Sequence, residues 1–201
     1  MAYRRAGLLD EAHAQFQHAS KRYEEHGDDV GQALVQQNLG WLLENRGRYR
    51  AALACARRAL RLSRRAANIG GQADALNNIG WYHAQLGDHG QALVYCRQAR
   101  DTQRRLGNRH GEADAWDSIG YAHHELGQYA EAVDAYREAL DRYRADADRY
   151  SEADVLTHLG EAHHAAADPD AATGCWQQAL CILDELDHPD ATHVRARLGD
   201  R

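Results

Sequence analysis

The chain has 201 residues, enough to bury a core without metals or disulfides, and 44% hydrophobic with 27% charged residues is typical of a globular protein in water. No apolar run approaches the roughly 18 residues of a membrane-spanning helix, and the first residues lack the apolar stretch of a signal peptide, so we expect a cytoplasmic protein without membrane partners. The net charge of −6 is unevenly placed, since residues 1–110 carry 17 Lys and Arg against 10 Asp and Glu, whereas residues 111–201 carry 7 against 20.

Helices are predicted in pairs along almost the whole chain, because Ala, Leu, Arg and Glu dominate and Pro169 and Pro189 are the only prolines. The chain opens with a helix over 8–26. First helices are expected at 30–45, 70–85, 110–125 and 150–166, and second helices at 48–64, 88–105, 128–144 and 169–186. A short amphipathic helix around 190–198 is expected to cover the last hydrophobic face.

The helix pairs recur at a constant period along the chain. The repeated small residues inside the first helices are Gly40, Gly80, Gly120 and Gly160, and those in the second helices are Ala52, Ala92, Ala132 and Ala172. A glycine inside a helix costs about 1 kcal/mol relative to alanine, so its repetition predicts that a neighbouring helix approaches too closely for a side chain. We expect a single array over 1–201. Its parts are a truncated leading repeat at 1–27, repeats at 28–67, 68–107, 108–147 and 148–187, and a capping segment at 188–201.

The best-conforming copy is Trp116-x-x-Ile119-Gly120-x-x-His123, followed by Ala132-x-x-x-Tyr136. It resembles the tetratricopeptide repeat (TPR) family, whose pattern is W-x2-L-G-x2-Y and then A-x3-F, with histidine here in the place of the tyrosine. The resemblance implies an all-α fold, a right-handed α-solenoid of helix-turn-helix TPR-like repeats. Two departures, the period of 40 rather than 34 and the missing closing proline, imply longer helices and a looser array.

The adjacent His123, His124 and Glu125 raise the question of a metal or acid-base site. His123 shares its repeat position with His83 and His163, where the family packs an aromatic side chain, so we expect it to pack. The HExxH zinc motif is absent because no histidine follows at the required spacing. His124 and His164 could face each other and stay as metal-ligand candidates of an alternative hypothesis.

No catalytic motif is recognisable. There is no GxSxG turn, and the single lysine does not follow a glycine-rich loop. We therefore predict a protein that is not an enzyme, without catalytic residues and without a cofactor.

By the same resemblance, the first helices line a concave groove that holds a protein or peptide partner. The expected groove residues are Asn38, Trp41, Asp74, Asn77, Asn78, Trp81, Asp114, Asp117, Tyr121, His124, Asp154 and His158. Asparagines could hold a peptide backbone, and the aromatic residues would be apolar anchors. The acidic residues towards the C-terminal end favour a ligand with basic residues there. In the alternative, the aromatics pack between repeats and the asparagines face water.

Arginines crowd the second helix at 48–64 and its end. Five of them stand close together, namely Arg57, Arg58, Arg61, Arg64 and Arg65. Because the packing positions of this helix are Ala52, Ala56, Ala59 and Leu60, we expect the arginines on the outer face, in water. Contact with DNA phosphates or with an acidic domain is the alternative, but no base-reading motif is present, so direct nucleic-acid binding is not predicted.

The segments 75–100 and 152–172 resemble the C-terminal repeats of actinobacterial antibiotic-regulatory (SARP-like) transcriptional activators, in which a DNA-binding domain and an NB-ARC-type ATPase precede the repeats. The resemblance implies the regulatory or sensor segment of a larger bacterial transcriptional or signalling regulator, with the parent's own domains as intramolecular partners. The alternatives are a freestanding scaffold or peptide receptor and a histidine-based metal-binding protein. The opposite charges of the two halves also lead us to expect self-association into a homo-oligomer.

Overall fold

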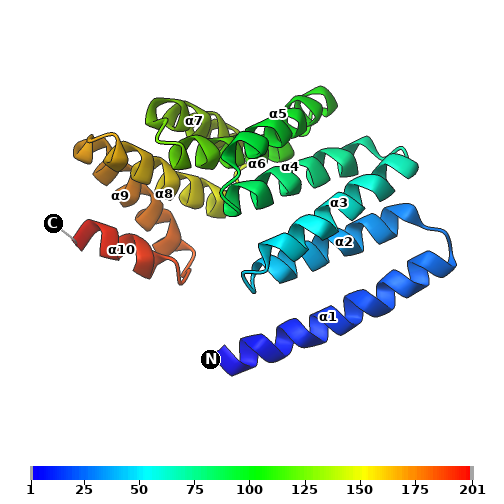
Figure 1. Cartoon of the computed structure of the whole chain (residues 1–201). Coiled ribbons are helices and arrows are strands. Elements are labelled where there is room, and N and C mark those ends of the chain that lie inside the picture. The colour runs from blue at the N-terminus through cyan, green and yellow to red at the C-terminus, as the bar shows by residue number, and fades with distance from the viewer. Residues whose placement is uncertain (1, 200–201) are drawn as a thin grey trace. The chain divides into compact units, whose positions relative to one another are not determined.

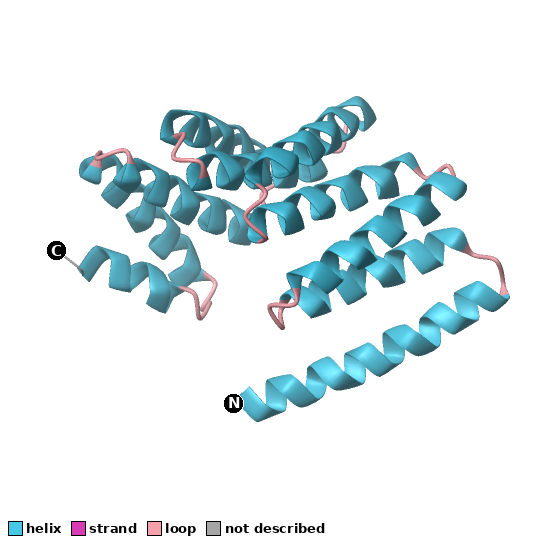
Figure 2. Ribbon diagram, viewed as in Figure 1, coloured by secondary structure: helices cyan, strands magenta, loops and turns pink. Residues whose placement is uncertain are grey.

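The computed structural model describes residues 2–199, with side chains from Glu11 onward except those of Ala12 and His13. Within this part of the chain the regular elements are helices joined by short turns (Figures 1 and 2). They are α1 (Ala2–Glu25), α2 (Asp29–Glu44), α3 (Tyr49–Arg65), α4 (Ile69–Gln85), α5 (His89–Leu106), α6 (Arg109–Glu125), α7 (Tyr129–Ala145), α8 (Arg149–Ala165), α9 (Pro169–Glu185) and α10 (Ala191–Gly199). The all-α, helix-turn-helix prediction is confirmed, although α1 begins earlier than expected. None of the described helices is long and apolar enough to cross a bilayer.

The chain divides into two compact units, Met1–Thr102 and Gln103–Arg201, called unit 1 and unit 2 below. Unit 1 holds α1 to α4 and most of α5, and unit 2 holds the end of α5 and α6 to α10. In unit 2 one hydrophobic cluster runs from Ala113 to Val194 through α6, α7, α8, α9 and α10. The single array over 1–201 and its repeat boundaries stay a prediction.

Each repeat begins with a capped helix, and the cap comes from the same repeat position each time. The side chains of Asp28, Asn68, Asn108 and Asp148 accept a hydrogen bond from the backbone N–H three residues later, over 2.8 to 3.2 Å. Such caps satisfy an N–H group that has no partner inside the helix. The local sequence therefore determines where α2, α4, α6 and α8 begin.

The glycines inside the first helices make room for a side chain of the following helix, as predicted. A Cβ atom on Gly120 would lie 2.6 Å from Tyr136, and one on Gly80 or Gly160 would collide with Cys96 or Trp176. Gly40 is looser, with the Tyr82 hydroxyl at 3.2 Å from such a Cβ.

The looser packing at Gly40 has a local cause. The residue of α3 equivalent to Tyr136 is the small Ala56, and the space beside Gly40 is taken by Tyr82 of α4 instead. In unit 2 the sizes are exchanged, because Tyr136 is large and Ala162, the equivalent of Tyr82, is small. The space beside the glycine is thus filled by one large and one small side chain, and which of the two positions carries the large one differs between repeats.

Candidate functional site

A row of apolar side chains is exposed on α2 in unit 1. Val30 is 48% exposed, Leu34 55% and Trp41 57%. Their spacing of four and seven residues places them on one stripe of the helix. Trp41 belongs to the predicted groove set, whereas Val30 and Leu34 were missed, although the spacing could have revealed them. We call these three residues the apolar row.

Trp81, at the position of Trp41 in the next repeat, is half-buried because it has a partner. Its indole N–H donates to Glu44 Oε1 at 2.6 Å, and the neighbouring Tyr82 hydroxyl donates to Glu44 Oε2 at 3.3 Å. Burial, followed by the negative charge of Glu44, raises the pKa of Tyr82. Since Glu44 lies one turn beyond Trp41, the two tryptophans lie on the same side of the α2–α4 pair.

The polar residues expected in the unit 1 groove are accessible. Asn38, Asn77 and Asn78 are half-buried and Asp74 is exposed. The amide oxygen of Asn77 is buried, so the amide groups that can offer both a donor and an acceptor beside the apolar row are those of Asn38 and Asn78.

Unit 2 contains a pocket of 230 Å³ between α6, α8 and the α9–α10 region. It brings together three predicted residues, Tyr121, Asp154 and His158. The other lining residues are Tyr150, Thr157, Glu161, Leu183, Asp190, His193, Val194 and Arg197. The sequence did not predict that α10 lines this pocket, because the segment 190–198 was expected only to cover the last hydrophobic face.

The electrostatic field of this pocket favours positive charge. His158 Nδ1 lies 3.0 Å from Asp117 Oδ1. Burial alone would lower the pKa of His158, but the charges of Asp117, Asp154 and Glu161 outweigh it and raise the pKa to about 9. Tyr150 donates its hydroxyl to Asp190 Oδ2 at 3.1 Å. A histidine that stays protonated at neutral pH shows that the local carboxylates dominate.

Several of the predicted groove acids are used inside unit 2. Asp114 accepts a hydrogen bond from the Tyr143 hydroxyl at 2.7 Å, and Asp117 is paired with His158. Glu161 forms an ion pair with Arg197 of α10. Asp154 is exposed and lines the pocket. Among the predicted acids of unit 2, it is therefore the one most accessible to a ligand.

The repeated histidines help to close the turns between paired helices. His123 is only 9% exposed, which confirms its packing role, and its Nδ1 lies 2.6 Å from Gln128 Oε1. His83 and His163 face Asp88 and Asp168 in the same way, at 3.3 and 3.5 Å. Each pair joins the end of one helix to the residue that precedes the next.

The metal-ligand candidates of the sequence do line one pocket. His124 and His164 share a pocket of 570 Å³ with Glu161, Trp176 and Arg197. In the described part of the chain, however, no three His, Cys, Asp or Glu side chains are grouped so that they could hold a metal ion. The metal hypothesis thus has no ligand set here.

A family model described as Tetratricopeptide repeat matches residues 1–65 and 71–145. No curated protein matches the chain in sequence. Among solved structures, BtubC (BKLC) from P. vanneervenii has a TM-score of 0.75 at 21% identity, over 92% of this chain and 78% of that one. A Rap protein complexed with Competence and Sporulation Factor has a TM-score of 0.77 at 14% identity, over 94% of this chain and 51% of that one. Aspartyl phosphate phosphatase F from Bacillus subtilis has a TM-score of 0.79 at 12% identity, over the same two shares. The chain thus spans about half the length of the last two, and at these identities the similarity concerns the fold alone.

Proposed function

Because the chain belongs to the tetratricopeptide repeat family, we propose that it is a non-catalytic module that binds a peptide or an extended segment of a protein on the exposed face of its first helices. The observation that carries the proposal is the apolar row of α2. A tryptophan that is 57% exposed beside two exposed aliphatic residues is a surface that gains free energy when a partner covers it. Tryptophan is also the residue type most often found to dominate binding energy.

The two units favour different chemistry in the ligand. The apolar row and the asparagines of unit 1 suit an apolar side chain and a peptide backbone. The acidic pocket of unit 2 suits an arginine or lysine side chain, because the same carboxylates already hold His158 in its charged form. A solved structure of similar fold is a Rap protein in complex with Competence and Sporulation Factor, which supports a binding role by analogy of fold.

The larger context is also part of the proposal. The resemblance to the C-terminal repeats of SARP-like, NB-ARC-containing activators supports a regulatory or sensor segment of a bacterial transcriptional or signalling regulator, located in the cytoplasm. A freestanding scaffold or peptide receptor would use the same face, so the test below addresses the face rather than the parent protein.

The experiment is a selection of displayed random peptides on the purified chain, followed by affinity measurements on the selected peptides. Trp41→Ala should weaken binding about 30-fold, the size typical of a dominant interface residue. Val94→Ala is the matched control, since Val94 is 47% exposed in unit 1 but lies on the second helix of its pair. Equal affinity for Trp41→Ala and the native chain would remove the apolar row from the binding face.

A further inference from the structure

An arginine-lined pocket lies on unit 1, apart from the apolar row. It has a volume of 350 Å³ and is lined by Glu24, Gly27, Gln32, Arg58, Arg61, Leu62 and Arg65. The three arginines are spaced by three and four residues, so they form one stripe of α3. As predicted, the five arginines from Arg57 to Arg65 are exposed, but the pocket gathers three of them around one hollow.

Two of these arginines lack a carboxylate partner among the described residues. Arg65 donates to Asp29, with Nε at 2.9 Å from Oδ2. Arg58 and Arg61 form no ion pair or hydrogen bond with any part of the chain that the structure describes. The three guanidinium groups share a hollow whose lining has one carboxylate, that of Glu24, so an anion placed between Arg58 and Arg61 would relieve their mutual repulsion.

The equivalent place in unit 2 carries its own anion. Glu112 occupies in its repeat the position that Gln32 occupies in the first full repeat. It is 9% exposed and accepts a bond from Arg142 at 2.9 Å. Arg142 corresponds in the same way to Leu62, which lines the unit 1 pocket beside Gln32. The two places are therefore equivalent, but the pair Glu112–Arg142 is replaced by an uncharged glutamine and a leucine.

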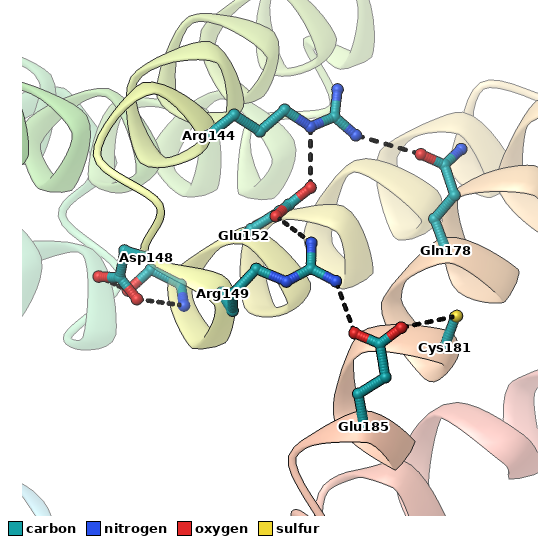
Figure 3. A network of polar contacts seen from close by, with 8 residues as sticks. Arg144, Asp148, Arg149, Glu152, Gln178, Cys181 and Glu185 are labelled. Atoms are coloured by element: carbon teal, nitrogen blue, oxygen red, sulfur yellow. Dashed lines mark hydrogen bonds and ion pairs between the residues drawn. The ribbon is translucent and has the colours of Figure 1, made fainter.

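The next repeat also has a buried glutamate paired with arginines, although these arginines, Arg144 and Arg149, stand at the repeat positions of Glu24 and Asp29. Glu152, again at the repeat position of Gln32, is 6% exposed and lies between two guanidinium groups (Figure 3). It accepts from Arg144 at 2.9 Å and from Arg149 at 2.7 Å, and Arg149 continues to Glu185. In both repeats of unit 2 a buried glutamate at this position pairs with nearby arginines, whereas Gln32, 7% exposed, has no charge with which to pair Arg58 or Arg61.

We infer that the unit 1 pocket binds a phosphate group, whose oxygens supply the anion that Glu112 and Glu152 supply in unit 2. The pocket lining carries three guanidinium groups against the single carboxylate of Glu24, and Asp29 pairs with Arg65, so positive charge exceeds negative charge. A phosphate monoester carries close to two negative charges at neutral pH and accepts paired guanidinium bonds. The group can come as free phosphate or on a phosphorylated side chain. This site is independent of the proposed peptide face.

The test is a calorimetric titration of the whole chain with inorganic phosphate, at constant ionic strength against chloride. The native chain should bind one phosphate saturably, and Arg58→Gln/Arg61→Gln should weaken binding by about tenfold or more, since each removes a charge-assisted donor. Arg64→Gln is the matched control, because Arg64 is exposed on the same helix and does not line the pocket. It should change the affinity by less than about twofold. An equal loss with Arg64→Gln would show general charge attraction and overturn the site, as would the absence of saturable binding.

Two further variants probe the cause. Gln32→Glu should abolish phosphate binding, because it places a fixed carboxylate beside the pocket arginines, as Glu112 and Glu152 are placed in unit 2. Glu24→Gln should tighten phosphate binding by removing a like charge from the pocket. If Gln32→Glu leaves phosphate affinity unchanged, the proposed equivalence with Glu112 and Glu152 is wrong. A phosphoserine peptide that binds at least about tenfold more tightly than inorganic phosphate would assign the site to a phosphorylated protein, and equal affinity would assign it to free phosphate.

Discussion

Trp81 and Glu44 are 37 residues apart and are joined by a hydrogen bond of 2.6 Å from the indole N–H to the carboxylate. The bond ties the end of α2 to the equivalent part of α4, and Tyr82 adds a second donor to the same carboxylate. Trp81 is therefore part of the connection between repeats, whereas Trp41, at the equivalent position, is free to meet a partner.

Glu44→Ala should destabilise the protein, because it removes the acceptor of two donors. Hydrogen bonds to a charged group contribute about 1.5–3 kcal/mol each, and screening at this half-exposed site reduces the sum, so we expect a loss of about 2 kcal/mol. Chemical denaturation would measure it. Trp41→Ala should change the free energy of unfolding by less than about 0.5 kcal/mol, since Trp41 is exposed. A comparable loss for both variants would contradict the distinction between the two tryptophans.

Gly120→Ala should destabilise unit 2, because the added methyl group would lie 2.6 Å from the ring of the buried Tyr136. Overpacking of this kind costs about 1–3 kcal/mol. Gly174→Ala is the control on α9, where nothing lies within 4 Å of the added atom. It should stabilise the helix by up to about 1 kcal/mol, and thermal unfolding of the two variants should shift in opposite directions.

Ala167→Gly should stabilise the protein. Ala167 has a φ of 61° at the position where the preceding repeat has Gly127 with a φ of 71°. A side chain in this left-handed region costs about 1–2 kcal/mol, of which the greater flexibility of glycine in the unfolded chain cancels part. Gly127→Ala should destabilise for the same reason. Equal and small effects in both variants, measured by denaturation, would mean that these turns carry no strain.

The pair of His158 and Asp117 should make stability depend on pH. The pKa of His158 is raised to about 9 in the folded chain, above the usual value near 6.5. A group of this kind contributes fully below the unfolded pKa, and its contribution is lost as the pH rises from about 6.5 through 9. The raised pKa corresponds to about 3 kcal/mol.

The measurement is the free energy of unfolding between pH 6 and 9.5 for the native chain and for His158→Gln. The difference between the two should be largest at the acidic end and should shrink as the pH increases. A difference that stays constant over this range would show that the charge of His158 does not contribute.

Local sequence determined much of this fold. Asp28, Asn68, Asn108 and Asp148 start their helices through contacts within three residues. The repeated glycines of the first helices predicted that a neighbouring helix approaches closely. The collision between a Cβ atom on Gly120 and the Tyr136 ring confirms it. The packing of His123 followed from its repeat position as well. These features depend on contacts within a few residues or on positions that recur at a constant period, and a single sequence is enough to reveal both.

Pairings between helices were decided by the tertiary structure. Trp41 and Trp81 occupy the same repeat position, yet only Trp81 has Glu44 as its acceptor. From the sequence, Arg58 and Arg61 were expected on a solvated helix face. The structure shows that they line a pocket together with the uncharged Gln32. Whether a charge or an indole is satisfied depends on which side chain a neighbouring helix brings within about 3 Å, and that distance exists only once the helices have packed.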